Sequence, residues 1–147
     1  MALERNKESA EARIIGNMGY PELFGKATFI QMPTGGMVIT VEVIGLPRES
    51  GFLGLHIHEV GDCTKPFDKT GSHYNPTGAA HPMHAGDLPP LLNNDGYAYL
   101  SFYDNRLQVA DIIGKSIIIH SMRDDFTSQP SGDAGQKIGY GVIRVQS

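Results

Sequence analysis

Two histidines separated by one residue, inside a run of alternating apolar residues, constrain this chain more than any other feature of it. The run is Gly54-Leu55-His56-Ile57-His58-Glu59. Successive side chains of a β-strand point to opposite faces, so His56 and His58 leave the strand on the same side while Leu55 and Ile57 can face a core. Two imidazoles held side by side on a rigid strand supply half of a metal site.

Short strands separated by turns account for much of the rest. Glycine (18 residues) and proline (9) are scattered between short apolar runs, which favours many short strands over long helices. We expect strands at 12–16, 25–31, 37–43, 52–59, 97–102, 109–113, 115–120 and 140–145. Residues 25–31 and 37–43 should form a hairpin across the glycine turn at 34–36. Eight or so short strands predict an all-β antiparallel sandwich or barrel.

The length of 147 residues predicts one domain over 12–147, preceded by a charged and flexible lead-in at 1–11. The net charge of −4 and the lack of a basic block argue against a nucleic-acid partner, and no apolar run is long enough to span a membrane. The lead-in lacks the features of a signal peptide, which predicts a cytoplasmic protein, or an exported one whose leader was removed. The single cysteine, Cys63, excludes an intramolecular disulfide.

Two long irregular stretches, 61–92 and 121–137, interrupt the strands. Loops of such length are usually functional or disordered. The first is rich in Gly, Pro, His and Asp, and a disordered segment would not usually carry so many ligand-type residues. We therefore expect an ordered, functional loop.

The candidate metal site consists of all the histidines in the chain and one carboxylate. Its members are His56, His58, His73, His81, His84, Asp87 and His120. One such histidine alone is more often an ordinary core or surface residue, but the segment 81–87 puts two imidazoles and a carboxylate close together, a donor set that suits Zn²⁺. Imidazoles suit copper as well. Seven donors exceed what one four-coordinate ion needs, so the pattern favours two ions, or one ion with spectators.

Seven motifs follow one another along the chain: Gly51-Phe52-Leu53-Gly54-Leu55-His56-Ile57-His58-Glu59, Gly71-Ser72-His73-Tyr74-Asn75-Pro76, His84-Ala85-Gly86-Asp87-Leu88, Ile118-Ile119-His120-Ser121, Asp124-Asp125, Gly132-Asp133-Ala134-Gly135 and Gly141-Val142-Ile143. In this order they resemble the copper/zinc superoxide dismutase family of the bacterial kind. The resemblance runs from about residue 25 to the C-terminus. It implies an eight-stranded antiparallel Greek-key barrel with two long functional loops.

The resemblance also implies a role for each donor. His56, His58 and His120 correspond to ligands of copper alone, and His73 to an imidazolate shared by copper and zinc. The remaining zinc ligands correspond to His81, His84 and Asp87. Asp124 matches a carboxylate that links a copper histidine to a zinc histidine, and such partners fix the tautomer and orientation of a ligand.

The implied activity is the disproportionation of superoxide, an antioxidant reaction. Copper takes an electron from one superoxide, which leaves as dioxygen, and gives it to a second, which leaves with two protons as hydrogen peroxide. His73 can supply one of those protons. Zinc does no redox work and holds the loop. The resemblance also allows a homodimer.

At three points the sequence departs from the family's pattern. The family joins the loop to the last strand by a disulfide, but here the position that would pair with Cys63 holds Tyr140. The position of the family's active-site arginine holds Lys137, which keeps the charge but not the bidentate fork. The segment from His81 to His84 is shorter than in many relatives.

Lys137 remains the predicted catalytic residue beside His73. A local positive field raises the rate at which an anion reaches a cleft, whatever the net charge of the whole protein. Lys65 and Arg123 are further candidates for that field.

Two alternatives remain open. The first is a copper- and zinc-binding protein of the same fold with little catalytic activity, serving metal buffering or delivery, which the residues at 137 and 140 motivate. The second is a zinc-only hydrolytic or structural site. It is weaker, because a hydrolytic zinc site needs three ligands and an open position, and this chain has twice as many histidines.

Overall fold

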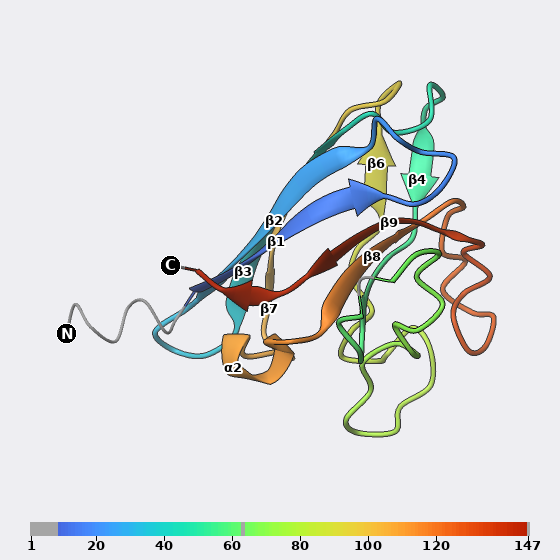
Figure 1. Ribbon diagram of the computed structural model, residues 1–147. Helices are drawn as coiled ribbons and strands as arrows, with labels where there is room; N and C mark the ends of the chain where they lie inside the picture. The colour runs from blue at the N-terminus through green and yellow to red at the C-terminus, as the bar shows by residue number, and fades with distance from the viewer. Residues whose placement is uncertain (1–8, 63, 147) are drawn as a thin grey trace.

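The computed structural model describes residues 9–62 and 64–146, whose regular structure is almost entirely antiparallel strand (Figure 1). The large sheet contains β1 (Ser9–Gly16), β2 (Phe24–Gln31), β3 (Met37–Ile44), β5 (Leu55–His58), β7 (Ala98–Asp104), β8 (Ser116–His120), β9 (Lys137–Val142) and β10 (Arg144–Val145). Its order is β5-β8-β9-β1-β2-β3-β7, with β10 paired to β1. A second, two-stranded sheet pairs β4 (Gly51–Leu53) with β6 (Leu91–Asn93).

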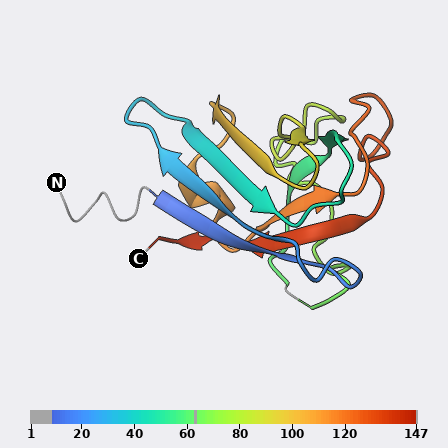
Figure 2. The same ribbon diagram turned by 90° about the horizontal axis from the view of Figure 1, so that it is seen from above.

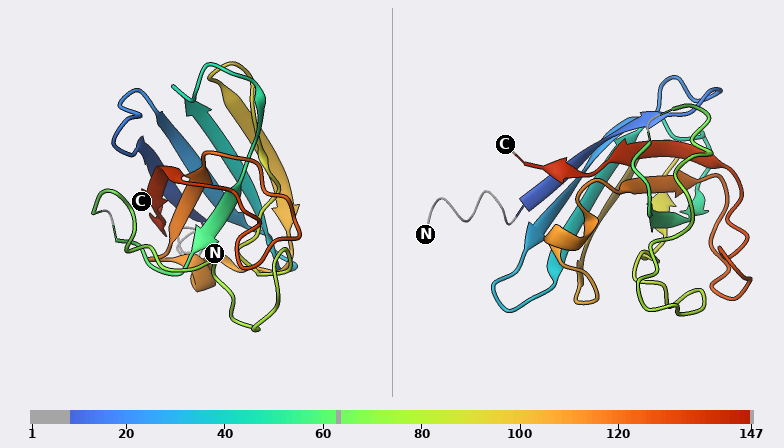
Figure 3. Two further views of the ribbon diagram at one scale, coloured as in Figure 1. Left: turned by 90° about the vertical axis from the view of Figure 1, so that its right-hand side faces the viewer. Right: turned by 60° about the horizontal axis from the view of Figure 1, so that its bottom comes forward.

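The large sheet curls around a core, as the views in Figures 2 and 3 show. Three consecutive strands, β1, β2 and β3, are joined as hairpins, and β9 returns from far along the chain to lie beside β1. That arrangement is a Greek key. The all-β antiparallel barrel expected from the sequence is confirmed.

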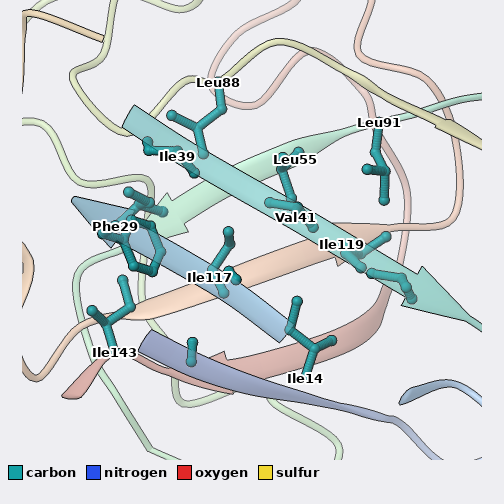
Figure 4. Packing of buried hydrophobic residues seen from close by; sticks show 14 of the residues in the cluster. Ile14, Phe29, Ile39, Val41, Leu55, Leu88, Leu91, Ile117, Ile119 and Ile143 are labelled. Atoms are coloured by element: carbon teal, nitrogen blue, oxygen red, sulfur yellow. The ribbon is translucent and has the colours of Figure 1, made fainter. Parts of the chain in front are cut away.

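The core forms because alternate residues of each strand are apolar and face inward. Met37, Ile39, Val41 and Val43 of β3 are each fully buried, as the alternation predicted. Figure 4 shows Phe29 of β2 and the inward side chains of β3 facing residues of β8 such as Ile117 across the curled sheet. Packing from both sides fixes the strands, and with them any side chain carried at their ends.

Several strand boundaries differ from the prediction. The expected strand at 52–59 is two strands, β4 and β5, because the chain changes partner at Gly54 from β6 to β8. The backbone of Gly54 instead donates to the carbonyl of Met122 and accepts from the amide of His120. The expected last strand begins earlier, at Lys137, and is divided into β9 and β10. β6 overlaps the end of the stretch 61–92, which was predicted to be irregular.

The prediction of a strand at 109–113 is wrong, because these residues form the short helix α2 (Val109–Ile112). Val109 and Ile112 are both buried, and a spacing of three residues puts them on the same face of a helix. Asp111 also accepts from the backbone amide of Gln108 at the N-terminus of the helix. In so short a segment, periodicity alone does not distinguish a strand from a helix.

Of the flexible lead-in predicted at 1–11, the structure describes residues 9–11. Residues 9–11 belong to β1, where Ala10 pairs with Phe29 and Glu11 with Thr28, so the strand begins earlier than expected. Pairing with β2 and burial of Ala10 account for the difference. The first eight residues lie outside the described part of the chain, as does Cys63.

The two long loops lie side by side at one end of the sheet (Figure 1). They contact each other at His81, whose backbone amide donates to the side-chain carbonyl of Gln129. Gln129 in turn donates to the carbonyl of His81. The loops are therefore ordered against each other beside the ends of β5 and β8.

Candidate metal centre

The strands bring four histidines together in what we call the first cluster: His56, His58, His73 and His120. Pairing of β5 with β8 puts His56 opposite Ile118, two residues before His120, and the ring centres of His56 and His120 are 4.7 Å apart. His73 reaches the cluster from the first loop through a bridge with His58, and its ring lies 3.9 Å from that of His56. One ring nitrogen of each lies within 4.8 Å of the others, and all four side chains are buried.

The second cluster consists of His73, His81, His84 and Asp87, also buried and within 4.8 Å of one another. The Asp87 carboxylate is its centre. One oxygen lies 2.7 Å from Nδ1 of His73, and the other lies 2.9 Å from Nδ1 of His81 and 3.1 Å from Nδ1 of His84. Three imidazole nitrogens and a carboxylate converging on one point form a donor set that suits Zn²⁺. The short spacing of His81 and His84 does not prevent this convergence.

His73 belongs to both clusters and connects them. Its Nδ1 faces Asp87 and His84, while its Nε2 belongs to the set of ring nitrogens in the first cluster. The two nitrogens of an imidazole lie on opposite sides of the ring, so one residue can face two ions. The geometry required of a shared histidine is present.

The ring nitrogens that face the first cluster have no hydrogen-bond partner among the described residues. They are Nδ1 of His56 and Nε2 of His58, His73 and His120, all buried. Buried polar atoms are almost always paired, so a convergent set without partners indicates a missing ligand. Four imidazole nitrogens with no thiolate fit copper, so the residues present fit the metal.

The opposite nitrogens of these rings are held by the protein. Nδ1 of His58 hydrogen bonds to the carbonyl of Gly71 at 2.8 Å, and Nδ1 of His120 to that of Gly135 at 3.3 Å. Because a carbonyl only accepts, each Nδ1 carries the proton and Nε2 keeps its lone pair for a metal. The carbonyls thus select the tautomer that can act as a ligand.

Asp124 contacts one histidine of each cluster, on the side of the ring that faces away from the cluster. Its buried carboxylate accepts from Nε2 of His56 at 2.7 Å and from Nε2 of His81 at 2.6 Å. Each histidine then presents Nδ1 toward its own cluster. The same carboxylate also accepts from the amide of Phe126, which holds it in place.

Burial favours the neutral form of three histidines of the first cluster, His56, His58 and His120. It lowers the pKa of His56 and of His58 to about 2, and that of His120 to about 4, with the neighbouring histidines adding to the effect. The pKa of Asp87 is lowered. Burial alone would raise it, but the hydrogen bond from His73 and the electrostatic attraction of His73, His81 and His84 outweigh the effect of burial. At neutral pH His56, His58 and His120 are therefore uncharged, and Asp87 is ionised.

An open cleft of about 470 Å³ gives access to the first cluster. His58, His73 and His120 line it together with the half-buried Lys137 at the start of β9. Burial lowers the pKa of the Lys137 ammonium, while Asp68 opposes this by raising it. The other two cations expected to attract an anion, Lys65 and Arg123, are exposed and are not among the residues that line this cleft.

Sequence reasoning missed the residues that hold the second cluster in place. The guanidinium of Arg106 donates to the backbone carbonyls of His84 and Asp87 and is itself paired with the buried carboxylate of Asp104 at 3.0 Å. Asp104 ends β7, so this pair ties the loop to the large sheet. The only signal in the sequence is an arginine two residues after an aspartate, which is too common to be informative.

Comparison with known proteins agrees with this geometry. The family model described as copper/zinc superoxide dismutase matches residues 23–143. The chain belongs to this family. The family and the two clusters therefore indicate copper and zinc as the cofactors. The family predicted from the sequence motifs is confirmed.

The relatives include both enzymes and a chaperone. Superoxide dismutase [Cu-Zn] of Deinococcus radiodurans is 36% identical over 144 residues, covering 82% of this chain and 77% of the relative. Superoxide dismutase [Cu-Zn] 2 of Aquifex aeolicus is 34% identical, covering 92% and 86%. The human copper chaperone for superoxide dismutase is 33% identical, covering 91% of this chain but 52% of the chaperone. This chain thus spans about half the length of that relative.

Among solved structures, the crystal structure of the clock protein EA4 superimposes with a TM-score of 0.83 at 28% identity, covering 95% of each chain. The likeness extends over the barrel and both loops. In the described part of the chain, no helix combines the length and apolar character needed to cross a membrane.

Proposed function

We propose that this protein is a superoxide dismutase that converts superoxide to dioxygen and hydrogen peroxide at a histidine-bridged copper and zinc site. One observation carries the proposal, namely that His73 faces both clusters and no other residue is common to them. The proposed copper ligands are His56, His58, His73 and His120, and the proposed zinc ligands are His73, His81, His84 and Asp87. Copper, when bound, supplies the one-electron redox chemistry, and zinc supplies charge and order.

The residues around the cleft support the reaction in three ways. Lys137 carries a positive charge at the cleft, which attracts and orients a small anion beside His58 and His120. His73 can hold a proton at Nε2 on the side of the first cluster and release it toward a departing product, while Nδ1 stays in contact with Asp87. Asp124 keeps His56 and His81 in orientation during turnover.

The test is a direct assay of superoxide removal by protein reconstituted with both metals. Lys137→Arg should retain most of the activity because it keeps the charge, whereas Lys137→Ala should lower kcat/KM about tenfold or more, with a weaker dependence on ionic strength. Metal content must be equal in all three proteins. Activity no higher than that of free copper in the same buffer would contradict the proposal.

A second candidate function has specific support. The similarity to a copper chaperone, together with the lysine at 137, favours a protein of this fold that buffers or delivers copper and zinc and turns over poorly. Fully loaded protein that removes little superoxide, yet transfers copper to a metal-free acceptor faster than a chelator of equal affinity does, would favour it. Retention of copper in the presence of that acceptor would favour the enzyme.

The homodimer and the cytoplasmic or exported location remain predictions. Sedimentation of the metal-loaded protein over a range of concentrations would test the first. Fractionation of the source cells would test the second.

A further inference from the structure

The first half of the long loop delivers His73 to the centre, and it has to be held without a covalent link. The sequence contains one cysteine, so no disulfide can form within the chain. A loop of this length costs conformational entropy when it is ordered, and specific contacts must offset that cost. The contacts between residues 64–73 and β9 are therefore of particular interest.

The main contact is an aromatic stack between Phe67 of the loop and Tyr140 of β9. Their ring centres are 4.5 Å apart with an angle of 23° between the planes, and both side chains are almost completely buried. With Ile118 of β8 they form a small apolar cluster separate from the main core. Aromatic pairs in this arrangement attract each other beyond the effect of buried area.

Polar contacts surround the stack and join the same two segments. The Lys137 ammonium donates to the hydroxyl of Thr70 at 2.6 Å and to the carbonyl of Phe67 at 3.2 Å. The Thr70 hydroxyl, fully buried, donates in turn to the same carbonyl. In addition, the side-chain amide of Asn17 donates to the backbone carbonyls of Pro66 and Lys137, each at 2.9 Å.

The backbone of Phe67 adds weight to this contact. Its φ of +73° lies in the left-handed region, which a residue with a side chain rarely adopts. Such a conformation persists where the surroundings determine it, and here the buried ring and the doubly bonded carbonyl do so. Phe67 is thus held in place from both its side chain and its backbone.

The anchored segment ends at the first cluster. Directly after Thr70, the carbonyl of Gly71 accepts from Nδ1 of His58, and Ser72 pairs with Glu59. His73 follows. A displacement of the segment would therefore move both the group that orients His58 and the shared histidine.

We propose that Phe67 and Tyr140 form a noncovalent latch, and that they act as positioning residues for the copper side of the centre. The latch fixes residues 64–73 against β9, and through Gly71 it fixes His58 and His73. It keeps Lys137 at the cleft through the carbonyl of Phe67. This inference rests on the proposed function only in taking the first cluster as the copper site.

The test compares variants of Phe67 with a variant of the main core. Phe67→Ala should increase amide hydrogen exchange across residues 64–74 of the metal-free protein. It should also weaken Cu²⁺ binding by about 10–100-fold, the range found when groups that orient metal ligands are lost, and change the electron paramagnetic resonance spectrum of bound Cu²⁺. Phe67→Leu and Thr70→Val should act in the same direction, and they supply the test if Phe67→Ala does not fold.

Phe29→Leu is the matched control. It removes an aromatic ring from the main core, a cluster that does not include Phe67 or Tyr140, so Tm should fall while Cu²⁺ affinity and spectrum equal those of the wild type. Phe67 variants that lower Tm while leaving Cu²⁺ affinity and spectrum unchanged would overturn the proposal. Wild-type protein that binds Cu²⁺ normally but removes no superoxide would contradict the proposed function and leave the latch standing.

Discussion

At the scale of single residues, the centre depends on which ring nitrogen each histidine presents. In His58 and His120 a backbone carbonyl holds Nδ1, and in His56 and His81 the Asp124 carboxylate holds Nε2. The other nitrogen is left for a metal in each case. The tautomers are thus set by the fold before any ion binds, which reduces the reorganisation that binding requires.

Replacement of one histidine separates the two clusters. His120→Ala should abolish copper-dependent activity and leave zinc content nearly intact, because His120 belongs only to the first cluster. Asp87→Ala should instead lower zinc content and Tm. Metal analysis and an activity assay on both variants provide the measurement. Equal losses of both metals in both variants would show that the division into two clusters is wrong.

At the scale of elements, the site is built where strand ends meet the two loops. His56, His58 and His120 lie on the paired strands β5 and β8. The strand pattern predicted that His56 and His58 share a face, whereas the association of His120 with them was implied only by the resemblance to the family. The positions of His73, His81 and His84 could not be derived in this way, since an irregular loop has no period. The close spacing of His81, His84 and Asp87 pointed to a zinc site, but the association of His73 with both clusters was implied only by the resemblance of whole motifs to a family.

The contacts that hold the loops were out of reach of the sequence for the same reason. Arg106 binds two backbone carbonyls, and Lys137 binds a backbone carbonyl and a hydroxyl. Every residue type carries a backbone carbonyl, so the sequence does not indicate which residue such a cation will contact. The segment at 109–112, which is mainly apolar but contains Asp111, is too short for its pattern to distinguish a strand from a helix. What the sequence predicted well was the burial of alternating residues, as in β3.

A prediction for this scale concerns Arg106. Arg106→Ala removes the hydrogen bonds to the carbonyls of His84 and Asp87 and leaves the buried Asp104 without its cation. The free energy of unfolding should fall by about 2 kcal/mol, because hydrogen bonds of charged groups contribute about 1.5–3 kcal/mol each and Arg106 is partly exposed. Zinc affinity should fall with it. Urea unfolding and a zinc competition titration test this. Arg106→Lys, which keeps the charge, is the control, and Arg106→Ala with unchanged zinc affinity would contradict the role of Arg106 in the loop.

At the scale of the whole molecule, the barrel carries a centre that opposes folding until metal binds. Four buried ring nitrogens of the first cluster lack a hydrogen-bond partner within the described residues, and desolvation of such groups is unfavourable. Metal binds only the folded form, so its binding energy stabilises the fold. Removal of both metals should accordingly lower Tm.

The pH dependence of the metal-free protein follows from the pKa values of the first cluster. In the unfolded chain His56 and His58 take up a proton near the ordinary pKa of 6.5, but in the folded chain burial lowers that pKa to about 2. Between these values the unfolded state binds more protons, so the free energy of unfolding should fall as the pH falls below about 6.5. Urea unfolding across this range is the measurement, and His58→Gln should reduce the slope. A free energy of unfolding that rises on acidification would contradict this account.

The central claim is that one imidazole, His73, is shared between a copper ion and a zinc ion. Anomalous diffraction from crystals of the metal-loaded protein, recorded at the copper and the zinc absorption edges, tests it most directly. The account predicts a copper peak among His56, His58, His73 and His120 and a zinc peak among His73, His81, His84 and Asp87, one on each side of the His73 ring. A single peak, or two peaks of which either lies out of reach of His73, would contradict it.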